Sequence, residues 1–267
     1  MAKIDILLPY WGDFDLAKQT VDSVLAQTSN DWSLFIADDC YPDESLYNYC
    51  KKLNNPKITY FKHKKNIGIT NNFNFCVKQA KNEFCVIIGC DDRLLPNFVE
   101  TALKNIKNAD FYQPNVEIID AESKKYLPIA DRVKRILRPK KSGLYYGENL
   151  AASLCHGNWL YFPSIVLKSE TIKKYQFDNK YKIAEDLALE LTMIIDGAKL
   201  FVDNTTTFQY RRFDESLSSK EKSGVRFSEE DAVYNDFSDK FELISWKKAN
   251  RAAKARITSR LNRLLSK

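Results

Sequence analysis

The chain has 267 residues, of which 44% are hydrophobic, and it carries 41 Lys and Arg against 35 Asp and Glu. This length suits one large α/β domain or two small ones. The composition, with 13% aromatic residues and few Gly and Pro, excludes a disordered, collagen-like or low-complexity protein. Apolar runs such as 85–90 are far shorter than the about 18 to 20 residues that span a bilayer.

The excess positive charge lies at one end of the chain. Residues 246–267 contain eight Lys and Arg and no acid, so the rest of the chain is slightly acidic. Apolar residues recur about every three or four positions in this tail, from Trp246 to Leu265, which predicts an amphipathic helix. Such a helix can lie on an anionic membrane surface or pack its apolar stripe against the domain, and the sequence leaves both open.

Cysteine and histidine usage indicates a reducing compartment. The six cysteines form no Cys-x-x-Cys pair, and there are only two histidines, so a Cys and His zinc site is not expected. The first residues, MAKIDILLPY, have the pattern of a strand and not of a secretory signal. We therefore expect a cytoplasmic protein with reduced thiols.

The first hundred residues alternate short apolar runs with amphipathic stretches. The runs predict strands at 4–8, 33–37, 57–61 and 84–88, and the stretches predict helices at 13–28, 43–53 and 70–81. Alternation of this kind predicts a parallel sheet with helices on both faces. In such sheets, ligands bind beyond the carboxyl ends of the strands.

Beyond about residue 110 the pattern is less regular. It predicts a strand at 111–120, a strand-like stretch at 157–168, a helix at 183–195, a short strand at 208–213 and an acidic helix at 228–243. A second basic run occupies 131–141. No Pro-, Gly- or Ser-rich linker separates two independent domains.

Acidic pairs follow two of the predicted parallel strands. Asp38 and Asp39 end the second strand, and Asp91 and Asp92 end the fourth. The Asp91 and Asp92 pair suits Mg²⁺ or Mn²⁺, which take one or two carboxylates and complete their shell with phosphate oxygens and water. A carboxylate at the end of the second strand, as in Asp38 and Asp39, can instead accept hydrogen bonds from the sugar hydroxyls or base N–H of a nucleoside. Turn formation and helix capping are the structural alternatives for each pair.

A third acidic pair, Glu185 and Asp186, opens the predicted helix at 183–195. The helix dipole favours acids at this position, and a general base that projects into a cleft is the functional alternative. The chain has no Gly-x-Gly-x-x-Gly after its first strand and no P-loop motif, which disfavours a dinucleotide-binding protein and a P-loop NTPase.

Together these segments resemble the inverting glycosyltransferases of family 2. Residues 66–96 are the most specific part, because they are similar to the family's Asn-x-Gly helix, fourth strand and metal motif in order. The resemblance extends over roughly 3–218 and includes ILLPYWGDFDLAKQTVDSVLAQT at 6–28, WSLFIADD at 32–39, PSIVLKSE at 163–170, AEDLALEL at 184–191 and YRRFDESLS at 210–218.

The resemblance implies a fold: GT-A, with a Rossmann-like, mostly parallel central sheet flanked by helices and a C-terminal helical extension. The expected boundaries are 1–218 for the transferase domain, with a nucleotide-sugar half at about 1–110 and an acceptor half at about 111–218. The extension, 219–267, includes the basic tail.

The resemblance also implies site residues. The nucleotide-sugar site would contain Pro9, Tyr10, Trp11, Asp38, Asp39, Asn66, Gly68 and Asp91. Trp11 would stack on the base, and Asp39 would accept its N–H. Asp92, with Asp91, would hold Mn²⁺ or Mg²⁺. Asp186 would be the catalytic base, and the acceptor site would include Glu185, Trp159 and Arg212.

Two positions depart from the family pattern. The first Asp of the usual Asp-x-Asp-Asp is Gly89 here, and the common His after the late Arg is Phe213. Variants with Gly at the first position occur in the family, so metal use is still expected. The second departure removes a histidine role from that loop.

The resulting hypothesis is a metal-dependent, inverting transfer of a sugar from a nucleotide-diphosphate donor, favouring a UDP-sugar, to a hydroxyl of a glycan or lipid-linked acceptor in surface polysaccharide biosynthesis. The expected location is cytoplasmic and peripheral, at the inner face of the plasma membrane. An anionic membrane surface would bind residues 246–267, and no nucleic acid is expected as a partner. The alternatives are a sugar-phosphate nucleotidyltransferase and a non-catalytic carbohydrate- or membrane-binding protein on a transferase scaffold.

Overall fold

The computed structural model describes residues 2–106, 108–213 and 224–255. The first half alternates strands and helices as the sequence predicts: β1 (Ile4–Tyr10), α1 (Phe14–Leu25), β2 (Trp32–Asp38), α2 (Ser45–Leu53), β3 (Ile58–Lys62), α3 (Ile69–Gln79) and β4 (Phe84–Ile87). Asp13 caps α1 by accepting from the Leu16 N–H at 3.1 Å, so the helix begins one residue later than the pattern predicted.

The second half contains shorter strands and most of the helices. Its elements are β5 (Arg93–Leu94), α4 (Phe98–Asn105), β6 (Phe111–Ile119), α5 (Ile129–Leu137), β7 (Gly143–Tyr145), α6 (Gly147–His156), η1 (Phe162–Ser164), β8 (Val166–Lys168), α7 (Ser169–Ile172), α8 (Glu185–Ile195), β9 (Leu200–Arg211), α10 (Gly224–Leu243) and α11 (Lys247–Ala255).

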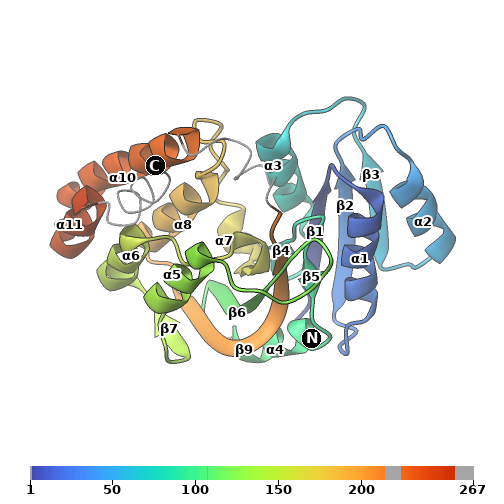
Figure 1. The fold of residues 1–267 in the computed structure, drawn as a ribbon, viewed down its shortest axis with the longest axis horizontal. Coiled ribbons are helices and arrows are strands. Elements are labelled where there is room, and N and C mark those ends of the chain that lie inside the picture. The colour runs from blue at the N-terminus through green and yellow to red at the C-terminus, as the bar shows by residue number, and fades with distance from the viewer. Residues whose placement is uncertain (1, 107, 214–223, 256–267) are drawn as a thin grey trace.

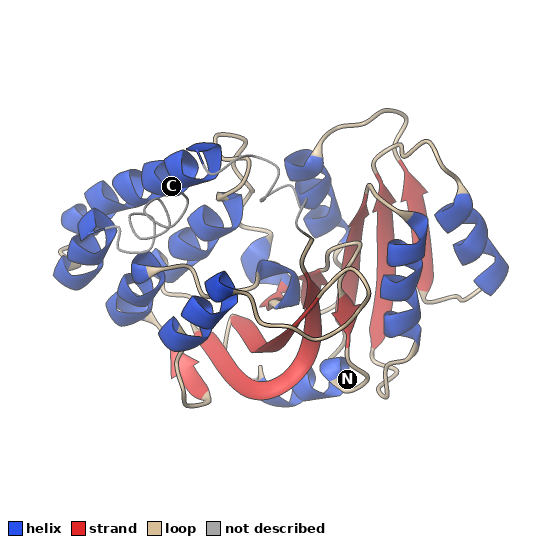
Figure 2. Cartoon of the chain, in the orientation of Figure 1, coloured by secondary structure: helices blue, strands red, loops and turns tan. Residues whose placement is uncertain are grey.

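The described strands form one sheet in the order β3-β2-β1-β4-β8-β6-β9-β5, with β7 paired to β9. Strands β1 to β4 are parallel, and β8 joins them antiparallel to both β4 and β6. Figure 2 shows these strands running through the molecule between helices. The predicted α/β class with a helix-flanked, mostly parallel central sheet is therefore confirmed, and the antiparallel pairs lie in the second half.

Apolar side chains pack on both faces of the sheet. In β1, Ile4, Ile6 and Leu8 contribute to the cluster that includes α1, whereas Leu7 contributes to the cluster that includes α3. The second cluster continues through α6 and α8 to α10 and α11. Figure 1 shows the result: β1 to β3 with α1 and α2 lie at one end of the molecule, and α5, α6, α8, α10 and α11 gather at the other.

The basic tail packs on the domain over the part that is described. Ala249, Ala252 and Ala253 of α11 are buried, and α11 contacts α6 and α10. Trp246, just before the helix, stacks on Phe241 with ring centroids 5.9 Å apart. Of the two alternatives for an apolar stripe, residues 247–255 therefore adopt packing, and residues 256–267 lie outside the described part of the chain.

Two strand predictions need correction. Only 166–168 of the stretch 157–168 is a strand, because 162–164 form a 3₁₀ turn in which Ser164 donates to Tyr161 O at 2.8 Å. The strand predicted at 208–213 begins at Leu200, since β9 continues through the polar residues 203–207 alongside β6. Within the described residues, no helix is both long and apolar enough to cross a membrane.

Candidate active site

The residues after β1 form an aromatic wall at the carboxyl edge of the parallel strands. Trp11 is 50% exposed, and its ring meets Tyr41 edge-on with centroids 5.2 Å apart. Pro9 is partly exposed beside it. Tyr10, in contrast, is fully buried, and its hydroxyl donates to Gly12 O at 3.0 Å. Trp11 and Pro9 are therefore open to a ligand, whereas Tyr10 supports the wall from inside and its contact with a nucleotide stays a prediction.

The two acids after β2 have separate tasks. Asp38 has no exposed surface, and its carboxylate accepts from Tyr41 N at 2.7 Å and from the Tyr60 hydroxyl at 2.6 Å. Its oxygens hold the Tyr41 segment in place, and direct contact between Asp38 and a nucleotide stays a prediction. The Asp39 carboxylate instead crosses to the loop before α3, where it accepts from Ile67 N at 2.7 Å and Gly68 N at 2.9 Å.

Asp39 thereby fixes the shape of the loop that contains Asn66 and Gly68. Gly68 has φ +84°, a conformation that favours glycine, and the Asn66 side chain accepts from its N–H at 3.0 Å. Asn66 is exposed and Gly68 is partly exposed. The structure thus brings Asp39, Asn66 and Gly68 together after β2. The neighbouring strand, β1, leads to Trp11.

The Asp91 and Asp92 carboxylates converge above Gly89. A Cβ on Gly89 would lie 2.7 Å from Asp92 Oδ2 and 3.0 Å from Asp91 Oδ1, so both oxygens approach the same backbone position. Burial raises the pKa of both carboxyls, and the Asp91 charge raises that of Asp92 further. Two such carboxylates side by side leave a concentrated negative charge that a cation would neutralise.

Arg211, at the end of β9, connects this acidic pair to the rest of the site. Its N–H donates to Asp92 Oδ1 at 2.9 Å, and its guanidinium donates to the main-chain oxygens of Asp91 and Asp120 at 2.8 Å each. The guanidinium thus fixes the backbone of the pair, while the Arg211 N–H engages one carboxylate oxygen, Asp92 Oδ1. No role for Arg211 is predicted from the sequence. Its position beside Arg212, in the segment that resembles the family's Arg-containing strand, is the one sequence feature that could have pointed to it.

The donor set fits a hard divalent cation. Two carboxylate oxygens converge, and oxygen is the ligand that Mg²⁺ and Mn²⁺ take. No cluster of three or more His, Cys, Asp or Glu residues suited to a metal occurs in the described parts of the chain. The protein would therefore supply the Asp91 and Asp92 carboxylates as ligands, and the remaining ligands would come from a diphosphate and water.

The third acidic pair occupies the first turn of α8. Glu185 is 6% exposed and accepts from the Thr70 hydroxyl of α3 at 2.7 Å. Burial raises the pKa of Glu185 to about 7; the Thr70 hydrogen bond opposes this shift, and the charges of Asp186 and Glu229 add to it. Asp186 is only partly buried, and its carboxylate accepts from Leu187 N at 2.7 Å. Of the two acids, Asp186 is therefore the one open to a substrate.

Glu229 of α10 holds the segment that leads into α8. One of its oxygens accepts from Lys182 N at 2.9 Å, Ile183 N at 2.7 Å and Ala184 N at 3.3 Å. Ala184 is the N-cap residue of α8, and Lys182 and Ile183 precede it, so Glu229 anchors the loop that enters the helix and satisfies one N–H of the helix start. The contact fixes where Glu185 and Asp186 project. From the sequence, Glu229 is predicted only to belong to an acidic helix.

Asp186 lines a cavity of about 210 Å³ between α5, α8 and the end of β9. Its polar lining also contains Lys134, Asn158, Tyr210, Arg212 and Glu230. Its apolar lining comes from both helices, with Ala130, Val133 and Leu137 of α5 and Leu187 of α8. The volume and the mixture of polar and apolar groups suit a small polar ligand such as part of a sugar.

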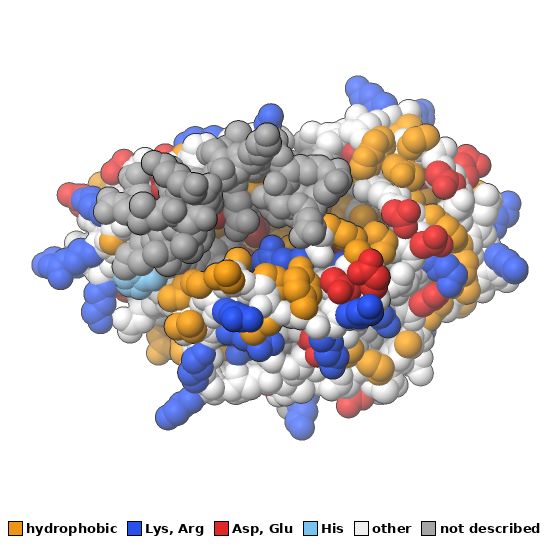
Figure 3. Space-filling model, viewed as in Figure 1, with side chains coloured by type: hydrophobic (Ala, Val, Ile, Leu, Met, Phe, Trp, Pro, Cys, Tyr) orange, Lys and Arg blue, Asp and Glu red, His pale blue; other side chains and the backbone are white. Residues whose placement is uncertain are grey.

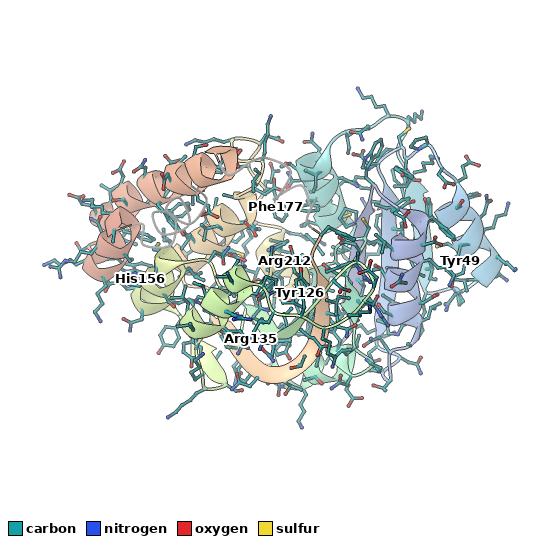
Figure 4. The ribbon with its side chains drawn as sticks, in the orientation of Figure 1. Tyr49, Tyr126, Arg135, His156, Phe177 and Arg212 are labelled. Atoms are coloured by element: carbon teal, nitrogen blue, oxygen red, sulfur yellow. The ribbon has the colours of Figure 1, made fainter. Side chains whose placement is uncertain are left out.

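Arg212 lies on this cavity, and Trp159 does not. The Arg212 guanidinium binds Asp131 in a bidentate pair, Nε to Oδ2 at 2.7 Å and Nη2 to Oδ1 at 3.0 Å. Figure 4 shows Arg212 in the middle of the molecule, well away from Tyr49 at one end and His156 at the other. Trp159 has no exposed surface and donates to the Ser153 hydroxyl at 3.1 Å, and its contact with an acceptor stays a prediction.

Comparison with known proteins gives a family and several relatives. Residues 5–166 match a sequence profile described as Glycosyl transferase family 2. A protein of Escherichia coli K12, whose name provisionally assigns it to colanic acid biosynthesis as the glycosyl transferase WcaA, is 27% identical over 91% of this chain and 84% of its own length. A glycosyltransferase of Rickettsia bellii with no assigned role is 28% identical, but covers 46% of this chain and 18% of that protein.

Solved structures share the fold at low sequence identity. S. aureus TarS 1–349 superposes with a TM-score of 0.71 at 14% identity, over 95% of this chain and 71% of that chain. The same fragment in complex with UDP-GlcNAc gives 0.67 at 15% identity, over 87% and 65%. The mannosyltransferase PcManGT of Pyrobaculum calidifontis, in complex with GDP-Man and Mn²⁺, gives 0.65 at 10% identity, over 97% and 74%.

Proposed function

Because the chain belongs to glycosyltransferase family 2 and has the GT-A fold, we propose that it transfers a sugar, in a metal-dependent and inverting reaction, from a nucleotide-diphosphate donor to an acceptor hydroxyl. The observation that carries this proposal is the convergence of Asp91 and Asp92 above Gly89, at the same sheet edge as the loop fixed by Asp39. Neither alternative, a nucleotidyltransferase or a non-catalytic binding protein, has a specific observation in its favour.

The donor nucleotide would lie against the aromatic wall. The half-exposed Trp11 ring offers a face for the base, and Asp39 retains lone pairs beyond those that accept from Ile67 and Gly68. A base N–H could donate to those lone pairs, with Asn66 and Gly68 bordering the nucleoside. We favour a UDP-sugar, in line with the UDP-GlcNAc complex of TarS; the GDP-Man complex of PcManGT makes a GDP-sugar the competitor.

A divalent cation held by Asp91 and Asp92 would neutralise the departing diphosphate. The chain's own residues prepare this site: Thr20 donates to Asp92 O at 2.7 Å, and Arg211 holds the Asp91 backbone. PcManGT was solved with Mn²⁺, which supports Mn²⁺ or Mg²⁺ here. Fixed carboxylates in a buried setting stabilise charge without having to reorganise during the reaction.

Asp186 would remove the proton from the attacking hydroxyl. It lines the 210 Å³ cavity, where an acceptor sugar could bind, and Arg212, Lys134 and Asn158 surround it with donors. One displacement by that hydroxyl at the anomeric carbon inverts its configuration, so the reaction needs a single base and no protein nucleophile. Glu185, buried behind Asp186, would position the helix start and not contact the acceptor.

The acceptor is proposed to be a glycan or lipid-linked saccharide of surface polysaccharide biosynthesis. Support comes from the E. coli relative, whose name refers to colanic acid biosynthesis. A lipid-linked acceptor would place the reaction at the cytoplasmic face of a membrane. The nucleotide half at about 1–110 and the acceptor half at about 111–218 would then meet at the acidic pair, with 219–267 as an extension.

Thermal shift with UDP-, GDP- and dTDP-sugars, each with and without Mn²⁺, tests the donor and the metal together. We expect one nucleotide class to stabilise the protein, and only with Mn²⁺. The Asp92→Asn variant should lose this response, whereas Asp15→Asn, a change at an exposed acid of α1, should keep it. A protein that responds to none of the nucleotides, or equally well in both variants, would contradict the proposal.

A further inference from the structure

Helix α5 exposes isoleucines to solvent. Ile129 is 71% exposed and Ile136 is 73% exposed, and Tyr126, just before the helix, is 40% exposed. Ile129, Arg132 and Ile136 are spaced by three and four residues, so they share one side of the helix. Large apolar side chains are exposed singly on most proteins, but two on one helical side form a surface that a partner can cover.

Positive charge surrounds these isoleucines. Arg132 and Arg135 are exposed on α5, and Lys124, Lys140 and Lys141 are exposed on the segments that enter and leave it. In the entering segment, Lys125 is paired with Glu117 at 2.8 Å, and Glu122 is an exposed acid, so the net positive charge comes from the other five basic residues. The acidic residue of α5, Asp131, is fully buried and paired with Arg212, so it does not offset this charge at the surface. Figure 3 shows hydrophobic and Lys and Arg side chains next to one another over α5.

The same helix also lines the cavity that contains Asp186. Ala130, Val133, Lys134 and Leu137 face this cavity, while Ile129, Arg132 and Ile136 lie on the adjoining side. Whatever covers the exposed side of α5 is thus held within one helix width of the Asp186 cavity.

We propose that the exposed side of α5, formed by Tyr126, Ile129, Arg132, Arg135 and Ile136, binds an anionic lipid surface. The isoleucines would enter the headgroup region while the arginines contact lipid phosphates, which is how amphipathic helices lie on membranes. The proposal rests on the proposed function in one respect, because a lipid-linked acceptor gives this placement its purpose: the membrane delivers the acceptor beside the cavity.

Charge and side-chain type favour lipid over the other partners. A nucleic acid would be bound by the arginines with aromatic stacking, and it has little use for exposed isoleucines. A second copy of this chain would place one set of Lys and Arg against another, which is unfavourable. An anionic membrane complements both the apolar and the basic residues of this side.

Flotation with vesicles tests the proposal without donor, metal or acceptor. Wild-type protein is expected to float with vesicles that contain about 30% phosphatidylglycerol and to stay unbound with pure phosphatidylcholine. Ile129→Ser with Ile136→Ser should weaken binding about tenfold or more. The same change at Leu243, which is 85% exposed at the end of α10, is the matched control and should leave binding unchanged.

A second variant pair tests the charge. Arg132→Gln with Arg135→Gln should also weaken binding about tenfold or more and reduce its salt dependence, whereas Lys52→Gln with Lys78→Gln, two exposed lysines on α2 and α3, should not. These exposed changes should leave the melting temperature and nucleotide stabilisation intact, so a failure of vesicle binding is distinguishable from a failure of the proposed function.

Three results would overturn the inference. Vesicle binding that survives the isoleucine changes would indicate general attraction to polyanions, as for a nucleic acid. Binding that depends only on residues 246–267 would move the membrane contact to the tail. A dimer in light scattering that the isoleucine changes dissociate would identify a second copy of the chain as the occupant.

Discussion

Gly89 determines how closely two carboxylates can approach each other. With no Cβ at this position, Asp92 Oδ2 and Asp91 Oδ1 can lie against the backbone at the turn after β4. The family's usual residue there is an aspartate, so this chain has a glycine, with no side chain, where a third acid usually stands. The site would therefore bind its cation with one acidic side chain fewer, which makes the remaining pair more sensitive to displacement.

The Gly89→Ala substitution tests this sensitivity. The new Cβ would lie 2.7 Å from Asp92 Oδ2, which is closer than real Cβ contacts, so the carboxylate has to move. We expect Mn²⁺-dependent nucleotide binding to weaken at least about tenfold, measured by calorimetric titration with UDP in the presence and absence of Mn²⁺. Unchanged binding with the metal would show that the two carboxylates need not converge above Gly89.

Asp186→Asn separates donor binding from transfer. The substitution keeps the shape of the side chain and removes its basicity, so the nucleotide should bind within about twofold of the wild-type affinity while transfer falls by about 10² to 10⁴. Glu230→Gln, on the same cavity, is the matched control and should retain most of the activity. Transfer that persists in Asp186→Asn would exclude Asp186 as the base.

Glu185 should make stability depend on pH. Its folded pKa of about 7 lies above the ordinary 4.5, so folding favours the protonated form. The stabilisation is complete below about pH 4.5 and is lost as pH rises through 7. As pH rises through 7, the wild-type free energy of unfolding should therefore fall by up to about 3 kcal/mol relative to that of Glu185→Gln, which cannot ionise.

Urea unfolding of both proteins at pH 5 and pH 8 measures this difference. Because other buried acids also titrate, the comparison uses the gap between the two proteins and not the wild-type profile alone. A gap that is the same at both pH values would show that the Glu185 carboxyl has an ordinary pKa.

At the scale of elements, the start of α8 depends on another helix. Glu229 of α10 accepts from three consecutive N–H groups before α8, so Glu229→Ala should lower the free energy of unfolding by about 1 to 2 kcal/mol. Because the segment that orients Asp186 would loosen, transfer should fall more than nucleotide affinity. Glu229→Gln keeps an acceptor oxygen and should recover most of both; equal losses in the two variants would contradict capping.

The first half of the chain could be predicted from the sequence because its elements are local. Apolar runs such as 84–88 and amphipathic stretches such as 70–81 identify strands and helices, and a parallel sheet brings their carboxyl ends to one edge. The positions of Asp39 and Asp91 follow from that topology. Their partners do not, because the Asp39 contact with Gly68 joins residues whose spacing in the chain carries no periodic signal.

The second half of the chain could be predicted only in part. The sequence indicates only a basic run at 131–141, although α5 occupies 129–137, because Lys and Arg conceal a short helical pattern whose two isoleucines stay exposed. Arg211 was missed because arginine is ordinarily a surface residue, whereas this one is 3% exposed and bound to main-chain oxygens. Such roles depend on tertiary contacts, which no local pattern encodes.

At the scale of the whole molecule, α11 closes one end of the core. Ala249 has no exposed surface where α11 meets α6 and α10, so Ala249→Asp would bury a charge there. We expect a loss of at least about 3 kcal/mol in the free energy of unfolding. Arg251→Asp, on the exposed side of the same helix, should change it by less than about 1 kcal/mol.

Equilibrium unfolding of the two variants provides the comparison. A similar, small loss in both would show that α11 contributes little to the core, and the basic tail would again be free to act as a separate membrane segment. A large loss in Ala249→Asp alone would mean that α11 is part of the folded core. A variant that lacks residues 246–267 would then be destabilised, and a loss of membrane binding in that variant could not be assigned to the tail.

One helix start connects the two ends of the reaction. Asp39 holds Gly68 immediately before α3, and Thr70, two residues further on, donates to Glu185 beside Asp186. A nucleotide that shifts the Gly68 loop would therefore also shift the support of Asp186, the proposed base. Discrimination between donors should then be expressed in kcat as well as in KM: a poorly fitting sugar nucleotide would bind and still turn over slowly, so affinity alone would underestimate how selective the enzyme is.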